Sequence, residues 1–217
     1  MSADTTTTDG PVSELREPAA ACAGRLRDAD SVLLASHIDA DGLTSAAVAA
    51  TALRRAEIPF ETVFAKQLDA AEIDRIAATD HDTVLFTDFG SGQLDLIAPH
   101  VDAGAFTPVV VDHHQPADLP DADATEFHLN TLLFGIARAL EPPGGDNRDL
   151  AGLAVVGATG DMQATDGGLS GANRRIVEEG VAAGVLEEAT DLLVYGRQTR
   201  PLPKLLEYAN DVRIPGI

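Results

Sequence analysis

Cysteine is almost absent from the sequence. Cys22 stands alone among 217 residues, so an internal disulfide bond is excluded and the composition suits the reducing cytoplasm. No apolar run approaches the length of about 18 residues that a membrane span needs, so no membrane association is expected. The polar start, MSADTTTTDG, lacks the basic and apolar pattern of a signal peptide. We expect residues 1–11 to form a disordered acidic tail.

Lysine is nearly absent as well, with only Lys66 and Lys204 in the chain. The 15 basic residues face 35 acidic ones, which gives a formal net charge of −20. Such a surface either repels nucleic-acid phosphate or keeps a protein soluble in high salt, where repulsion is screened within about 3 Å at 1 M. The acids are spread over the whole chain and lysine is scarce, so the composition favours a salt-adapted, halophilic protein. Net charge therefore does not exclude a nucleic-acid substrate.

Short apolar runs alternate with helical patterns through the first 130 residues. Strands are expected at 31–36, 60–65, 83–87, 108–111 and, as a short fifth strand, 127–129. Helices are expected at 12–27, from Gly42 to 56, at 69–78 and at 94–101. Near-continuous apolar strands that alternate with helices are typical of a parallel sheet covered on both faces. The sequence therefore predicts an α/β fold with a parallel five-stranded sheet flanked by helices.

The strand signals stop after about residue 132. Further helices are expected at 149–163, 171–184, 186–195 and 203–209. We therefore expect a parallel α/β core over residues 12–132 and a helical C-terminal portion over residues 133–217.

Acids and histidines follow three of the predicted strands. The segments are His37-Ile38-Asp39-Ala40-Asp41-Gly42, Asp88-Phe89-Gly90 and Asp112-His113-His114. Parallel sheets bind ligands at the carboxyl ends of their strands, so these side chains are expected at one edge. Alone, the motifs at 37–42 and 88–90 are more typical of a turn or a helix cap, whereas two adjacent histidines directly after a strand already favour a ligand site. Three such motifs at one edge are better explained by a binding site.

The residue types indicate a divalent metal. Carboxylates bind hard divalent ions, and imidazole shifts the preference from magnesium toward manganese, zinc or iron. The alternating pair Asp39 and Asp41 can send its carboxylates to two different ions, and Gly42 opens the next helix beside them. Asp161 is a further candidate, because it lies late in an otherwise apolar helix where a charge needs a partner.

Together these motifs resemble the DHH phosphoesterases. Asp112-His113-His114 is similar to the family signature, and the segments HIDADG at 37–42, LFTDFG at 85–90 and GATGDMQ at 157–163 are similar to its first, second and fourth motifs. The order and the spacing also agree, and the resemblance covers about residues 30–217. The phrases SHIDADG, VVVDHHQP and HLN most resemble the archaeal RecJ-like nucleases, and the acidic, lysine-poor style is haloarchaeal.

The resemblance implies a centre of two divalent metal ions, usually manganese, with magnesium as the alternative. Asp88 would bridge the ions, His114 would contact the scissile phosphate, and Asp112 would orient its neighbours. The positions that match family ligands, with His37 as a further ligand or close neighbour, are Asp39, Asp41, Asp88, His113 and Asp161. The chain would activate a water molecule for phosphodiester hydrolysis without a protein nucleophile.

The chain departs from the family pattern in three respects. Many bacterial members begin the first motif with an aspartate where this chain has Ser36. Thr131 follows Asn130 where family members usually have a proline and a longer segment, and the second, DHHA1-type substrate-binding domain is expected to be absent. The leading function is a RecJ-like exonuclease on single-stranded DNA or RNA, acting in repair or replication. One alternative is a phosphodiesterase for short oligonucleotides or dinucleotides. The other is a non-catalytic partner of replication proteins.

Overall fold

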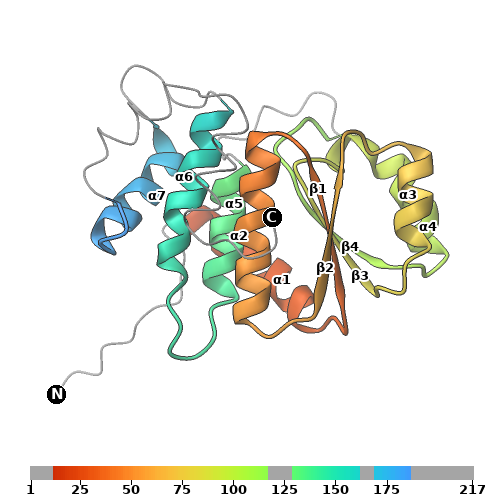
Figure 1. Ribbon diagram of the computed structural model, residues 1–217, viewed down its shortest axis with the longest axis horizontal. Coiled ribbons are helices and arrows are strands. Elements are labelled where there is room, and N and C mark those ends of the chain that lie inside the picture. The colour runs from red at the N-terminus through yellow and green to blue at the C-terminus, as the bar shows by residue number, and fades with distance from the viewer. Residues whose placement is uncertain (1–11, 117–128, 162–168, 187–217) are drawn as a thin grey trace.

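A computed structural model describes residues 12–116, 129–161 and 169–186 of the chain (Figure 1). The expected tail at 1–11 and the helix expected at 203–209 lie outside the described residues, as does nearly all of the helix expected at 186–195. Within the described part, no helix combines the length and the apolar character that crossing a bilayer requires.

Four parallel strands form one sheet in the order β2-β1-β3-β4. They are β1 (Val32–His37), β2 (Phe60–Ala65), β3 (Thr83–Thr87) and β4 (Thr107–Val111). The register pairs Ser36 with Thr87, and Thr87 with Val111, so three strands end at the same level. The parallel α/β fold flanked by helices is therefore confirmed.

The prediction of a fifth strand at 127–129 was wrong, because the sheet has four strands and Leu129 begins a helix. That helix, α5 (Leu129–Ala139), buries Leu129, Leu133 and Ile136. Apolar residues three and four positions apart share one face of a helix, and this face packs into the core. Phe127 and His128 lie outside the described residues.

The helices cover both faces of the sheet. They are α1 (Arg16–Arg27), α2 (Ala40–Arg55), α3 (Ala70–Ala77), α4 (Leu94–Asp102), α5, α6 (Ala151–Gly160) and α7 (Gly171–Ala182), with short 3-10 turns η1 (Ser13–Leu15), η2 (Ser91–Gln93) and η3 (Asn147–Leu150). Figure 1 shows α3 and α4 on one side of the sheet and the other helices on the opposite side.

Alternate residues of the central strands point into two separate apolar cores. Leu34 and Leu85 join the larger core with α1, α2, α5 and α6, whereas Leu33 and Phe86 join the smaller core under α3 and α4. Burial on both faces explains why the central strands are apolar almost without interruption. Burial on both faces also fixes where each strand ends along the sheet. It therefore fixes the position of the residues that follow the strands.

Candidate metal centre

The carboxyl ends of β1, β3 and β4 bring acids and histidines together with the end of α6. Because the strands end level, His37, Asp88 and Asp112 occupy corresponding positions at the sheet edge. All eight residues predicted for the site lie here: His37, Asp39, Asp41, Asp88, Asp112, His113, His114 and Asp161. Three groups of these side chains have ligand atoms close enough together to hold an ion.

Asp88 lies at the middle of the cluster. Its backbone has a φ of 65°, a left-handed conformation that non-glycine residues seldom adopt and that occurs often at functional sites. Its amide donates to the carbonyl of Val111 at 3.1 Å, which extends the β3–β4 pairing past the end of both strands. The side chain is only 1% exposed. The fold therefore forces a carboxylate into a buried position.

The buried Asp88 carboxylate is poorly compensated. Its nearest charge partners among the described residues are the rings of His37 at 3.3 Å and His113 at 3.4 Å, and neither oxygen accepts a hydrogen bond of good geometry there. Burial, together with the charges of Asp41 and Asp39, raises the pKa of Asp88 to about 6. A bound cation would remove this penalty, so the site fits a metal on its own geometry.

One group of candidate ligands consists of His37, Asp39 and Asp88. His37 Nδ1 lies 2.8 Å from Asp39 Oδ2 and 3.3 Å from Asp88 Oδ2. On the other side of the ring, Nε2 lies 3.1 Å from the carbonyl oxygen of Lys66. A carbonyl can only accept, so Nε2 is the donor in this contact, and Nδ1 is the nitrogen that faces the two carboxylates and would bind a metal.

A second group consists of Asp41, His113 and Asp161. His113 Nε2 lies 3.5 Å from Asp41 Oδ2, and Nδ1 lies 3.8 Å from Asp161 Oδ2. The carboxylates raise the pKa of His113, with Asp88 having the largest effect. Asp161 ends α6, so it reaches the site because α6 packs against α2.

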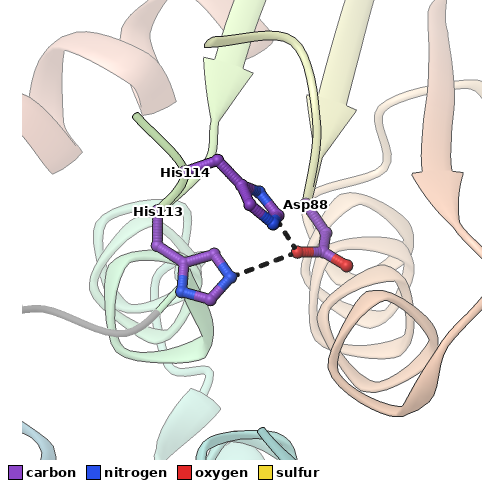
Figure 2. Close-up of side chains that lie close together, drawn as sticks. All are labelled: Asp88, His113 and His114. Carbon is purple, nitrogen blue, oxygen red and sulfur yellow. Dashed lines mark ion pairs between the residues drawn. The ribbon is translucent and has the colours of Figure 1, made fainter. Parts of the chain in front are cut away.

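Asp88 contacts a histidine from each of these two groups, through a different carboxylate oxygen in each case. Its Oδ2 faces His37 at 3.3 Å, and its Oδ1 faces His113 Nε2 at 3.4 Å. Figure 2 shows the Asp88 carboxylate directed toward the rings of His113 and His114, which come from the segment after β4. A carboxylate placed in this way can bridge two ions, as two-metal sites with separations of about 3.5–4 Å require.

Gly42 lets α2 begin directly against the cluster. Asp39 caps the helix, and its Oδ1 accepts from the amide of Gly42 at 3.2 Å. A Cβ on Gly42 would lie 2.5 Å from the carbonyl oxygen of His37 and 3.0 Å from Asp88 Oδ2. Glycine is therefore required by the close approach of the helix to the end of β1.

Asp112 and His114 form a separate ion pair beside the cluster. Asp112 Oδ1 accepts from the amides of His113 and His114 at 2.8 Å and 3.2 Å and lies 2.7 Å from His114 Nδ1, while its Oδ2 accepts from the amide of Ser91 at 3.0 Å. Burial alone would raise the pKa of Asp112, but these hydrogen bonds outweigh it and lower the pKa to about 2.

The ion pair with Asp112 also determines the protonation state of His114. Its hydrogen bond with Asp112 raises the pKa of His114 to about 9 against the opposing effect of burial, so the ring is an imidazolium at neutral pH. The side chain is 60% exposed, with Nδ1 turned toward Asp112. His114 forms the third group of candidate ligands with Asp88 and His113, and its exposed, charged ring is also placed to contact an anionic substrate.

The sequence did not identify several residues that support the site. Asn130, on α5, is fully buried and donates from Nδ2 to the carbonyl of Asp41 at 3.3 Å. A polar amide within an otherwise apolar helix was the available signal. Ser36 and Thr87 are also fully buried beneath the site. Their part in it depends on contacts between strands and helix that no local pattern reveals.

Comparisons with known proteins find similar sequences and similar folds. Residues 31–131 match the N-terminal domain of the DHH family, and residues 194–217 match the DHH-CID domain. The chain is 28% identical over 197 residues to the uncharacterized protein MJ0831 of Methanocaldococcus jannaschii. This alignment covers 84% of the chain and 44% of that protein, so the chain spans less than half of its curated relative.

Three solved structures share the fold. RecJ from Thermus thermophilus in complex with Mn²⁺ has a TM-score of 0.59 at 24% identity, over 79% of this chain and 27% of that one. An exonuclease RecJ bound to manganese gives 0.57 at 23% identity, over 90% and 54%. CDC45 from Entamoeba histolytica gives 0.55 at 16% identity, over 88% and 41%. The family match and the fold agree, since residues 31–131 are similar to the N-terminal domain of the DHH family and the chain shares the fold of the RecJ structures.

Proposed function

We propose that this chain carries the catalytic centre of a metal-dependent phosphodiesterase, a RecJ-like exonuclease that acts on single-stranded DNA or RNA. The observation that carries the proposal is the Asp88 carboxylate, which is buried, poorly compensated and shared between two groups of candidate ligands. A buried charge of this kind destabilises a protein unless a cation neutralises it. The DHH family match and the RecJ fold support the same kind of enzyme.

Two divalent ions would occupy the centre. His37, Asp39 and Asp88 would hold one ion, and Asp41, His113 and Asp161 would hold the other with Asp88 shared. The mixed carboxylate and imidazole donors favour manganese over magnesium, and two of the similar RecJ structures are described with manganese. When bound, such ions supply Lewis-acid activation of water and neutralise charge that develops on phosphate oxygens.

The protein contributes orientation and a fixed positive charge. His114 is an exposed imidazolium beside Asp88, and it would donate a hydrogen bond to a nonbridging phosphate oxygen. Asp112 keeps that ring charged and oriented through the 2.7 Å hydrogen bond at Nδ1. Asp112 also holds the backbone after β4, so it fixes His113 and His114 together.

Two other functions remain as candidates. The same cluster of candidate ligands suits a short oligonucleotide or a dinucleotide as substrate. The fold likeness to CDC45 supports a non-catalytic partner of replication proteins. The full candidate ligand set favours an enzyme over this last role, because a scaffold gains nothing from a buried, poorly compensated carboxylate.

The test is a hydrolysis assay on 5′-labelled single-stranded DNA, single-stranded RNA and dinucleotides, with Mn²⁺, Mg²⁺ or EDTA. We expect manganese-dependent release of nucleotides, and loss of at least about a thousandfold in Asp88→Ala because both metal positions lose a ligand. Asp80→Ala is the matched control, since Asp80 is an exposed aspartate at the opposite end of β3. This control should turn over like the wild type.

The outcomes separate the three functions. Turnover of dinucleotides alone would favour the small-substrate enzyme. Absence of turnover on every substrate, with Asp88→Ala indistinguishable from the wild type, would favour the assembly partner and contradict both enzyme functions. Near-normal turnover by Asp88→Ala would contradict the bridging role.

A further inference from the structure

Three hydroxyl side chains lie beneath the candidate metal centre without any exposed surface. Ser36 is on β1, Thr87 is the last residue of β3, and Ser45 is on α2, each 0% exposed. A buried hydroxyl destabilises the fold unless it has a hydrogen-bond partner. Valine or alanine would pack equally well in a core, so the partners of these hydroxyls need an explanation.

The hydroxyls of Ser36 and Thr87 form a chain that ends at the first turn of α2. Thr87 Oγ1 donates to Ser36 Oγ at 2.8 Å, and Ser36 Oγ donates to the carbonyl of Gly42 at 2.8 Å. The direction is fixed by chemistry, because a carbonyl only accepts and Ser36 has a single hydroxyl proton. Ser36 must therefore accept from Thr87, so the two hydrogen bonds work as one connection.

This connection joins the two segments that supply the shared ligand and its neighbours. Thr87 immediately precedes Asp88, and Gly42 immediately follows Asp41. The amide of Gly42 also donates to Asp39 at 3.2 Å, so the carbonyl and the amide of this glycine are both held. The hydrogen bonds from Thr87 to Ser36 and from Ser36 to Gly42 thus fix the position of the first turn of α2 relative to the end of β3.

We propose that Thr87 and Ser36 are positioning residues that set the distance between the Asp88 carboxylate and the carboxylates of Asp39 and Asp41. Ligands of a metal pair must be held within about 0.5 Å of the productive geometry, and groups behind the ligands provide that precision. The inference rests on the proposed function only in that the cluster binds divalent metal. It does not depend on the substrate or on turnover.

Ser45 supplies a matched control. Its Oγ donates to the same carbonyl of Gly42 at 2.7 Å, and it is as fully buried as Ser36. Ser45 belongs to α2 itself, so its hydrogen bond closes within the helix and connects nothing to β3. Removing Ser45 tests the loss of a buried hydroxyl without breaking the connection between elements.

The experiment measures Mn²⁺ affinity and stoichiometry of the whole chain by titration calorimetry and by electron paramagnetic resonance of free Mn²⁺. Thr87→Val keeps the shape and removes the hydroxyl, whereas Thr87→Ser keeps the hydroxyl. We expect Thr87→Val and Ser36→Ala to weaken Mn²⁺ binding by about tenfold to a hundredfold, the usual effect of losing a group behind a ligand. Thr87→Ser and Ser45→Ala should stay within about threefold of the wild type.

Urea unfolding in EDTA identifies the folded variants, and Ser36→Ala decides if Thr87→Val does not fold. Wild-type affinity in the folded hydroxyl-deleted variants would overturn the proposal. An equal loss in Ser45→Ala, or no rescue by Thr87→Ser, would also overturn it, because the effect would then be one of packing. A wild-type chain that binds no Mn²⁺ overturns this proposal and the metal centre together. Mn²⁺ binding without hydrolysis contradicts the enzyme function alone.

Discussion

At the scale of single residues, Asp88 and Asp112 are both buried carboxylates, but their surroundings affect the charged form in opposite ways. Both side chains are 1% exposed, and each follows the end of a strand. Asp112 receives three backbone amides and an imidazolium, which stabilise its charge. Asp88 has histidine rings at 3.3 Å and 3.4 Å as its nearest charge partners among the described residues, and two neighbouring acids oppose its ionisation. The first arrangement holds a loop in place, and the second is suited to a cation.

We predict that Asp88→Asn stabilises the metal-free protein at neutral pH. The pKa of Asp88 is about 6 in the fold against 3.8 for an ordinary aspartate, so the charged form is penalised. The penalty is absent below about pH 4, grows as the pH rises to about 6, and then reaches about 3 kcal/mol, at 1.36 kcal/mol for each unit of pKa. Asparagine removes the charge and tolerates the left-handed backbone. Urea unfolding in EDTA across this pH range measures the difference.

Asp112→Asn is the control with the opposite sign. The pKa of Asp112 is about 2, so its charge contributes stability that is present above about pH 4 and lost as the pH falls through 2. This variant should be less stable than the wild type at neutral pH by about 2 kcal/mol. Destabilisation by both variants would contradict the assignment of Asp88 as a poorly compensated charge.

At the scale of elements, the sequence predicted the strands and their ligand edge well. Residues 60–65 and 83–87 were predicted as strands with the bounds observed for β2 and β3. Each is a short run next to a clear turn, so local pattern is sufficient there. The predicted strand at 127–129 failed because three residues are too few to show a helical period. The true signal lay in the later apolar residues of α5, from Leu133 to Ile136.

The packing of helices around the site could not be predicted from local pattern. Asn130 of α5 donates a hydrogen bond to the carbonyl of Asp41 in the first turn of α2. Helix α6 packs closely against both of these helices. Gly157 allows that approach, because a Cβ there would lie 2.1 Å from Asn130 Nδ2 and 2.4 Å from Thr44 Oγ1. Glycine inside an apolar helix is ambiguous in sequence, since only the neighbouring helices show why it is needed.

We predict that Gly157→Ala weakens both the fold and the metal centre. The added methyl group must push α6 away from Asn130 and Thr44, which costs about 1–3 kcal/mol in a packed core. The shift also moves Asp161 away from His113, so Mn²⁺ affinity should fall together with stability. Gly152→Ala on the same helix is the control, because its Cβ would meet Leu186 at an ordinary 3.7 Å.

The control variant should keep wild-type Mn²⁺ affinity and gain up to about 1 kcal/mol from better helix propensity. Urea unfolding and calorimetric titration with Mn²⁺ measure both effects. Equal behaviour of the two alanine variants would show that α6 is not held against Asn130.

At the scale of the whole molecule, acidic charge is the dominant feature. Several arginines pair with acids around α2, α5 and η3, including Arg55 with Asp149 and Arg148 with Asp146. These pairs cannot balance the chain, whose net charge of −20 leaves a large excess of acidic residues. Mutual repulsion opposes compaction, and salt weakens it. This net charge of the whole chain is separate from the local charge of the metal site.

We predict that the chain is stabilised by salt, as the halophilic interpretation of the sequence requires. The urea midpoint at about pH 7 should rise when KCl increases from about 0.1 M to about 2 M, because the Debye length falls from about 10 Å to a few ångströms. The control is the same pair of titrations near the isoelectric point of about 4.4, where net repulsion vanishes. An equal rise at both pH values would indicate a general strengthening of apolar burial by salt rather than screening. An unchanged midpoint at neutral pH would contradict the salt-adapted interpretation.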